Sequence, residues 1–194
     1  ISAMAGSRSS ARIRPACGAE ISTAASSRPW RRAAPATRAD MERIHTAKYL
    51  DEFKRLSDAG GGNAGFYSPF GPGSFEIAAV SAGLVKQAVS DVYHRRLDNA
   101  YVISRPPGHH CLPDASMGFC LLANIPIALE ALRAEAGPVR AAVVDWDVHH
   151  GNGTEVCFFD RDDTMTISLH QENCFPPDQG RADARGTGTG EGFN

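Results

Sequence analysis

The chain has 194 residues, of which 42% are hydrophobic, and a formal net charge of −2 at pH 7. These values suit one domain with a core, and they give no sign of direct nucleic-acid binding. No apolar stretch approaches the roughly 20 residues of a membrane-spanning helix, so we expect a soluble protein with no membrane partner.

The five cysteines form neither a zinc-binding Cys-x-x-Cys pattern nor a disulfide framework. A reducing compartment is therefore expected, which means the cytoplasm, or the nucleus or an organelle if the source is eukaryotic. Residues 1–36 are rich in Ser, Ala and Arg, with Glu20 as their single acid. Organelle transit peptides, disordered tails and residues foreign to a mature protein all share such a composition. We favour disorder here and place the folded domain at residues 37–194.

From Thr37 the pattern becomes globular, with apolar residues recurring from Met41 to Leu56. The glycine-rich loop that follows lacks the Lys-Ser/Thr pair of a phosphate-binding loop. A helix is expected from about Phe75 to Tyr93, with Ser74 as its cap. Its predicted core stripe recurs at helical spacing and comprises Ile77, Val80, Leu84, Ala88 and Val92.

Strands and helices then alternate to the end of the chain. Strands are expected at Asn99 to Ser104, Val139 to Val144 and Thr164 to Leu169. Helices are expected at Asn124 to Arg133 and Thr154 to Phe159. This alternation predicts an α/β fold with an open parallel sheet and helices on both faces. In such folds, ligands bind at the carboxyl ends of the strands.

Polar side chains follow the second of these strands. If the chain stays extended, Asp145, Asp147 and His149 project on one side and the apolar residues between them on the other. Carboxylate oxygen and imidazole nitrogen suit a divalent metal such as zinc, whose catalytic sites keep one position open. Taken alone, an Asp-x-Asp pair at a strand end is equally compatible with a loop cap or a salt bridge.

A second polar cluster follows the first strand. Arg105, two prolines and a glycine lead into His109 and His110, and the prolines cannot continue sheet pairing. Adjacent histidines in such a stiffened loop are candidates for acid and base groups beside the metal.

With Gly118-Phe119-Cys120 and Ser168-Leu169-His170, the order and spacing of these clusters resemble the histone deacetylase family, most closely its class II and bacterial deacetylase-like branch. The resemblance runs from about Pro35 to Asn194. It implies an arginase/deacetylase-like sheet, truncated at the C-terminus, and makes residues 37–194 the N-terminal part of a deacetylase catalytic domain.

The resemblance also implies two ion sites. Asp147 and His149 match two zinc ligands of the family. A structural monovalent cation, K⁺, is implied at Asp145, at the Ser168 hydroxyl and at backbone carbonyls that include that of Leu169. Oxygen ligands of mixed charge suit such a hard ion.

The catalytic groups implied by the resemblance surround the histidine pair. His110 matches the general base and His109 its electrostatic neighbour. Asp145 matches the carboxylate that hydrogen-bonds His109, and Asn152 lies behind His110. The residues matching the lining of the acyl-lysine tunnel are Gly118, Phe119 and Phe175.

Family members continue past the position of Asn194, where they supply a third zinc ligand, an Asp, and a Tyr that polarises the acyl carbonyl. We therefore expect this chain to be a fragment that is inactive alone, of a zinc-dependent deacetylase. Such an enzyme hydrolyses N-acetyl-lysine in histones or other proteins to lysine and acetate. The close alternative is an acetylpolyamine deacetylase, and the alternative of another class is a non-catalytic, deacetylase-like interaction protein. The expected partner is an acetylated lysine peptide or polyamine, and the oligomeric state is left open.

Overall fold

The structure is a computed structural model that describes residues 2–4 and 33–194. The prediction of a disordered segment at 1–36 therefore lies mostly outside the described residues. The helices are α1 Arg38–Met41, α2 Ala47–Asp58, α3 Ser74–Tyr93, α4 Asn124–Ala136 and α5 Asn152–Phe158, with a short 3-10 turn at Gly188–Gly190. Within the described part, no helix is long and apolar enough to cross a membrane.

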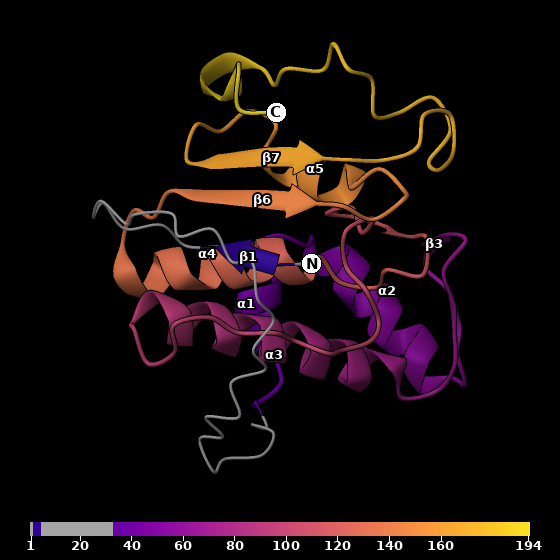
Figure 1. Cartoon of the computed structure of the whole chain (residues 1–194). Coiled ribbons are helices and arrows are strands. Elements are labelled where there is room, and N and C mark those ends of the chain that lie inside the picture. The colour runs from indigo at the N-terminus through magenta and orange to yellow at the C-terminus, as the bar shows by residue number, and fades with distance from the viewer. Residues whose placement is uncertain (1, 5–32) are drawn as a thin grey trace, which may run out of the picture.

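The main sheet has three strands in the order β1 Ser2–Met4, β6 Ala141–Asp145 and β7 Thr164–Ser168. β6 and β7 run parallel, and β1 pairs antiparallel with β6. Two further pairs are only two residues long: β2 Gly62–Asn63 with β4 Pro69–Phe70, and β3 Gly65–Phe66 with β5 Ser116–Met117. Figure 1 shows β6 and β7 above the helices α3 and α4.

The apolar segment from Met41 to Leu56 contributes to two helices. α1 begins with a capping box in which Thr37 and Asp40 exchange hydrogen bonds. A turn follows α1, and the Thr46 side chain caps α2 by accepting a hydrogen bond from the Tyr49 amide. Each of the two helices therefore has its own N-cap.

α3 has the predicted length but buries a different face. Gly73, at φ 73°, and not Ser74, is its N-cap. Ile77 is 56% exposed, whereas the buried positions are mostly small and include Ala78, Ala79 and Ala82. Small side chains let the backbone of residues 34–36 pass close to α3, where the Ala36 amide donates to the Ala79 carbonyl at 2.8 Å. The predicted stripe was therefore wrong by part of a turn.

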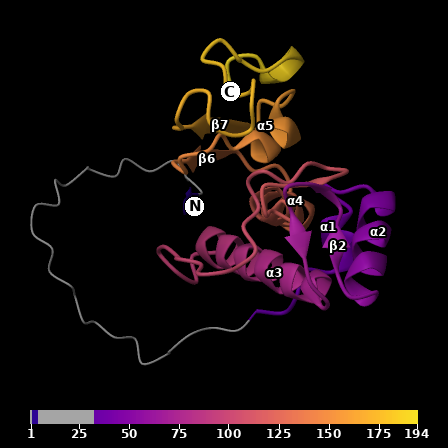
Figure 2. The ribbon, with the colours of Figure 1, turned by 90° about the vertical axis from the view of Figure 1, so that its right-hand side faces the viewer.

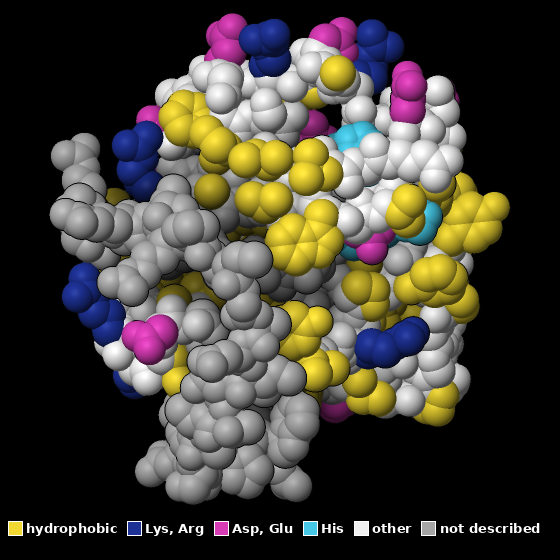
Figure 3. Space-filling model, viewed as in Figure 1, with side chains coloured by type: hydrophobic (Ala, Val, Ile, Leu, Met, Phe, Trp, Pro, Cys, Tyr) yellow, Lys and Arg dark blue, Asp and Glu magenta, His cyan; other side chains and the backbone are white. Residues whose placement is uncertain are grey.

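The parallel register of β6 and β7 fixes the geometry of the site. Val143 pairs with Thr166 and Asp145 pairs with Ser168. One face of these strands packs on α4 and α5, with Val143, Leu129 and Phe158 in a common apolar cluster. Figure 2 shows α4 and α5 on the same side of the sheet. In the part of the chain that the structure describes, the other face is open: Met165 and Ile167 are exposed there. Figure 3 shows hydrophobic side chains spread over this side of the molecule.

The predicted strand from Asn99 to Ser104 does not form. Both edges of β6 are already paired, one with β1 and the other with β7, so this segment has no ladder to join on that strand. Tyr101 and Ile103 are exposed, and Ala100 and Val102 line a cavity of about 200 Å³ between α3, α4 and β6.

Candidate active site

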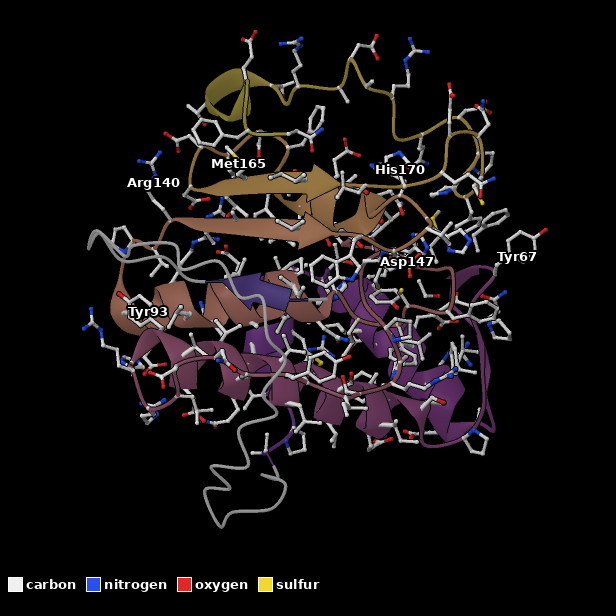
Figure 4. The ribbon with its side chains drawn as sticks, viewed as in Figure 1. Tyr67, Tyr93, Arg140, Asp147, Met165 and His170 are labelled. Atoms are coloured by element: carbon white, nitrogen blue, oxygen red, sulfur yellow. The ribbon has the colours of Figure 1, made fainter. Side chains whose placement is uncertain are left out.

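The polar clusters meet at the carboxyl ends of β6 and β7, as parallel pairing requires. In Figure 4, Asp147 and His170 lie beyond the arrowheads of these strands, while Arg140 lies at the opposite end. Tyr67, from a loop far away in sequence, points outward on the side of Asp147.

The histidine loop is held against the start of α5. The His109 carbonyl accepts hydrogen bonds from the amides of Gly153 and Thr154, at 2.8 and 3.2 Å. Gly108 passes so close to the backbone of Leu122 and Asn124 that a side chain would not fit there. These contacts place both imidazoles next to each other, with ring centroids 3.9 Å apart.

His109 is fixed by Asp145, the last residue of β6. The distance from His109 Nδ1 to Asp145 Oδ2 is 2.8 Å, and both side chains are buried. Burial by itself would raise the pKa of Asp145, but the hydrogen bond with His109 and that residue's charge hold it below its usual value. The carboxylate is therefore ionised at neutral pH, and His109 donates its Nδ1 hydrogen to it.

His110 is fixed by Asn152, the first residue of α5. His110 Nδ1 lies 2.8 Å from Asn152 Oδ1, and the Asn152 amide nitrogen donates to the Met117 sulfur. Because an amide oxygen only accepts, His110 carries its hydrogen on Nδ1 and keeps a lone pair on Nε2. Burial, and then the charge of His109, lower the pKa of His110 to about 4. The imidazole is thus neutral at pH 7 and able to accept a proton.

Asp147 and His149 do not follow the predicted alternation. The strand stops at Asp145 and the chain bends, and Asp147 Oδ1 accepts the amide of His149 at 2.8 Å. The two side chains still meet, with His149 Nδ1 3.1 Å from Asp147 Oδ1, and they are 40% and 45% exposed. Within residues 2–4 and 33–194, no three His, Cys, Asp or Glu side chains converge on one metal position.

The residues predicted to hold a monovalent cation are neighbours by register. Asp145 lies opposite Ser168, whose hydroxyl accepts the Gly151 amide at 3.2 Å. The Leu169 amide donates to the Asp145 carbonyl at 2.8 Å. The cation itself stays a prediction.

The aromatic side chains at the mouth are arranged around Phe175. Its ring lies 4.9 Å from the His110 ring and 5.9 Å from the His149 ring, edge to face in both cases. Gly118, at φ 54°, leaves no room for a side chain between His110 and Phe175. Phe119, at φ 64°, is 61% exposed; its role as a tunnel wall stays a prediction.

Further side chains adjoin these residues, and sequence reasoning missed His150 and Glu155 among them. Phe66 stacks on Phe175 with centroids 6.3 Å apart, and Tyr67 meets it edge to face. His150 pairs with Glu155 at 3.0 Å. Glu155 lies one turn into a short helix, and no motif distinguishes it from a solvated helix charge.

Comparisons with known proteins show what this chain is similar to. The histone deacetylase domain family matches residues 8–194. A histone deacetylase-like amidohydrolase of Pseudomonas aeruginosa is 56% identical over 164 residues, which cover 84% of this chain and 43% of the relative. A probable deacetylase of Methanothermobacter thermautotrophicus is 40% identical over 150 residues, covering 77% and 45% of the two chains.

The crystal structure of the HDA15 HD domain matches with a TM-score of 0.78 and 33% identity, and covers 83% of this chain and 47% of that domain's chain. The match confirms the predicted α/β, arginase/deacetylase-like fold. The chain spans about half the length of these relatives. On the extent of the family match and the identity to its relatives, the chain belongs to the histone deacetylase family.

Proposed function

We propose that this chain carries the acid-base groups and two zinc ligands of a deacetylase that hydrolyses N-acetyl-lysine, in histones or other proteins, to lysine and acetate. The observation that supports this most directly is the state of His110. The Asn152 side-chain oxygen accepts the hydrogen on His110 Nδ1, so His110 Nε2 keeps its lone pair. A neutral, oriented imidazole of this kind is what a general base at pH 7 requires.

Asp147 and His149 fit zinc as two members of a ligand set. They offer a carboxylate and an imidazole within 3.1 Å of each other on the open side of the histidine pair, and catalytic zinc sites use three protein ligands. When bound there, the ion would supply Lewis acidity, acidifying water and polarising the substrate amide oxygen.

His110 Nε2 takes the proton of the attacking water and later gives it to the departing lysine amine. The transfer creates a positive charge in a buried place. His109, 3.9 Å away and paired with the Asp145 carboxylate, stays in one tautomer and brings a negative charge nearby that offsets this positive charge. Removing that carboxylate would make His110 a poorer proton acceptor.

Phe175, together with Gly118 and Phe119, would line the path of the acetylated side chain. Gly118 approaches the rings of His110 and Phe175 too closely for a side chain, and the Phe175 ring would offer apolar contact to the methylene groups of the substrate. An acetylated polyamine would satisfy the same groups, so the substrate test needs both compounds.

The test is a chimera in which this chain replaces the 164 aligned residues of the Pseudomonas aeruginosa relative. We expect it to hydrolyse a fluorogenic acetyl-lysine peptide, with the relative itself as positive control. A chelator should abolish the activity and zinc should restore it. A folded chimera that binds zinc without hydrolysing either acetyl-lysine or acetylspermidine would support the non-catalytic, interaction-protein alternative instead.

Competition between acetylspermidine and the acetyl-lysine peptide separates the two substrate classes. We expect the peptide to have the higher kcat/KM; the reverse order would assign the site to polyamines. The chain without the remainder of the relative should lose zinc on dialysis against a weak chelator, because two donors under-coordinate the ion. Stoichiometric zinc in that sample would mean that a third ligand within the chain has been overlooked.

A further inference from the structure

The loop of residues 170–180 is joined to the segment that carries His149. The Gln171 amide donates to the Val148 carbonyl at 2.9 Å, and the His150 amide donates to the Phe175 carbonyl at 3.1 Å. These two hydrogen bonds lie on either side of His149 in the sequence. They therefore fix where Phe175 lies relative to His149.

The two ends of this loop are closed by the His170 ring. His170 Nε2 lies 3.0 Å from the Gly180 carbonyl oxygen, and Nδ1 lies 2.9 Å from the Ser168 hydroxyl. A carbonyl only accepts, so the ring hydrogen is on Nε2 and the Ser168 hydroxyl donates to Nδ1. The ring thus links the end of β7 to the far end of the loop.

The His150 ring lies against the His170 ring, with centroids 4.7 Å apart and the ring planes tilted by 52°. Its Nε2 lies 3.0 Å from a carboxylate oxygen of Glu155, and the two side chains are 5% and 15% exposed. Burial would raise the pKa of Glu155, but the hydrogen bond to His150 keeps it below its usual value. Glu155 therefore fixes the His150 ring from α5.

Gly180 completes this cluster by having no side chain. Its φ is 73°, and a Cβ there would run into the rings of both His170 and His150. Only a glycine at position 180 lets the end of the loop pack directly against the His170 and His150 rings.

We propose that Glu155, His150 and His170 are positioning residues that hold Phe175 against His110 and His149. The proposal rests on the proposed function only in stating that Phe175 lines the substrate path. A cluster with a merely structural role would change the stability of the fold without changing the position of the Phe175 ring in the folded protein.

The test uses the chain itself and reads this position by NMR. NOEs between the ring protons of Phe175 and those of His110 and His149 are expected, since the ring centroids are 4.9 and 5.9 Å apart. Glu155→Leu removes the acceptor of His150 and should abolish these NOEs. Glu155→Gln keeps an oxygen acceptor and should restore them.

A second variant keeps the test decisive if Glu155→Leu does not fold. His170→Phe retains a ring against His150 but loses the hydrogen bonds to Ser168 and Gly180, so it should also abolish the Phe175 NOEs. The matched control is Glu172→Gln, an exposed charge on the same loop, which should leave them unchanged.

Persistence of the NOEs in folded Glu155→Leu or His170→Phe would overturn the proposal. Intact NOEs in the wild-type chain, combined with an inactive zinc-loaded chimera, would count against the deacetylase function and leave the positioning role in place. The two failures are therefore distinguishable.

Discussion

The two halves of the site are built differently. His109 and His110 lie in a buried place where each Nδ1 has a hydrogen-bond acceptor from the fold, Asp145 for one and Asn152 for the other. Asp147 and His149 are 45% and 40% exposed, and the hydrogen-bond partner of each side chain comes from within this same pair. The first half is preorganised by packing.

The difference shows which part of the chemistry the described residues fix. Proton transfer needs a defined tautomer and orientation, and buried acceptors provide both. Metal binding needs donors that can give up their hydrogen bonds when the ion arrives, and partly exposed side chains do so at little cost in folding. The two halves should therefore respond differently to substitution.

The largest expected effect is on catalysis in the chimera. His110→Ala should lower kcat/KM by about 10²- to 10⁴-fold, as for loss of a general base, and should leave zinc bound. Asp147→Ala should remove both activity and zinc. Kinetics combined with metal analysis after dialysis check this, and loss of zinc in His110→Ala would mean that the role assigned to His110 is wrong.

The next effect is on stability. Asp145→Ala removes the buried carboxylate that accepts the His109 Nδ1 hydrogen and should lower the free energy of unfolding by about 1.5–3 kcal/mol. Asp147→Ala changes an exposed carboxylate and should stay within about 0.5 kcal/mol. Urea titration of the chain measures both values, and similar losses for the two variants would contradict the distinction drawn here.

A buried histidine outside the site shows what burial alone does. The His45 Nε2 accepts the Ala123 amide, and its Nδ1 faces the Pro113 carbonyl. Burial lowers the pKa of His45 from 6.5 to about 4, so between these values the unfolded chain binds more protons than the folded one.

Stability from His45 is therefore fully present above pH 6.5, falls as the pH drops towards 4, and changes no further below that. The loss should reach at most about 3 kcal/mol. In His45→Gln, the free energy of unfolding measured between pH 4 and 6.5 should no longer show this His45-dependent fall. An unchanged profile would show that folding does not shift the pKa of His45.

The smallest effect concerns the tautomer of His110. Asn152→Leu leaves its buried Nδ1 hydrogen without an acceptor and should cost about 1–3 kcal/mol of stability. The ¹⁵N chemical shifts of the His110 ring should also show that the Nδ1-protonated form is no longer the main one. Retention of that form would mean that another group sets the tautomer.

Much of the fold was predictable because it depends on local chemistry. α4 ends at Ala136 with Gly137 at its C-cap, and β6 and β7 form within one or two residues of the predicted strands. The order of the polar clusters also predicted the edge of the sheet at which they meet, since parallel strands end together.

The sequence by itself determined the fold class, the residue types at the site and the family to which the chain belongs. Tertiary structure alone decided which strand edges are paired, so that Asn99 to Ser104 stays outside the sheet although its composition is that of a strand. It also brought Glu155 to His150 and His170 to Gly180. Hydrogen bonds between distant segments depend on where the backbone runs in space, and local sequence patterns carry no information about that.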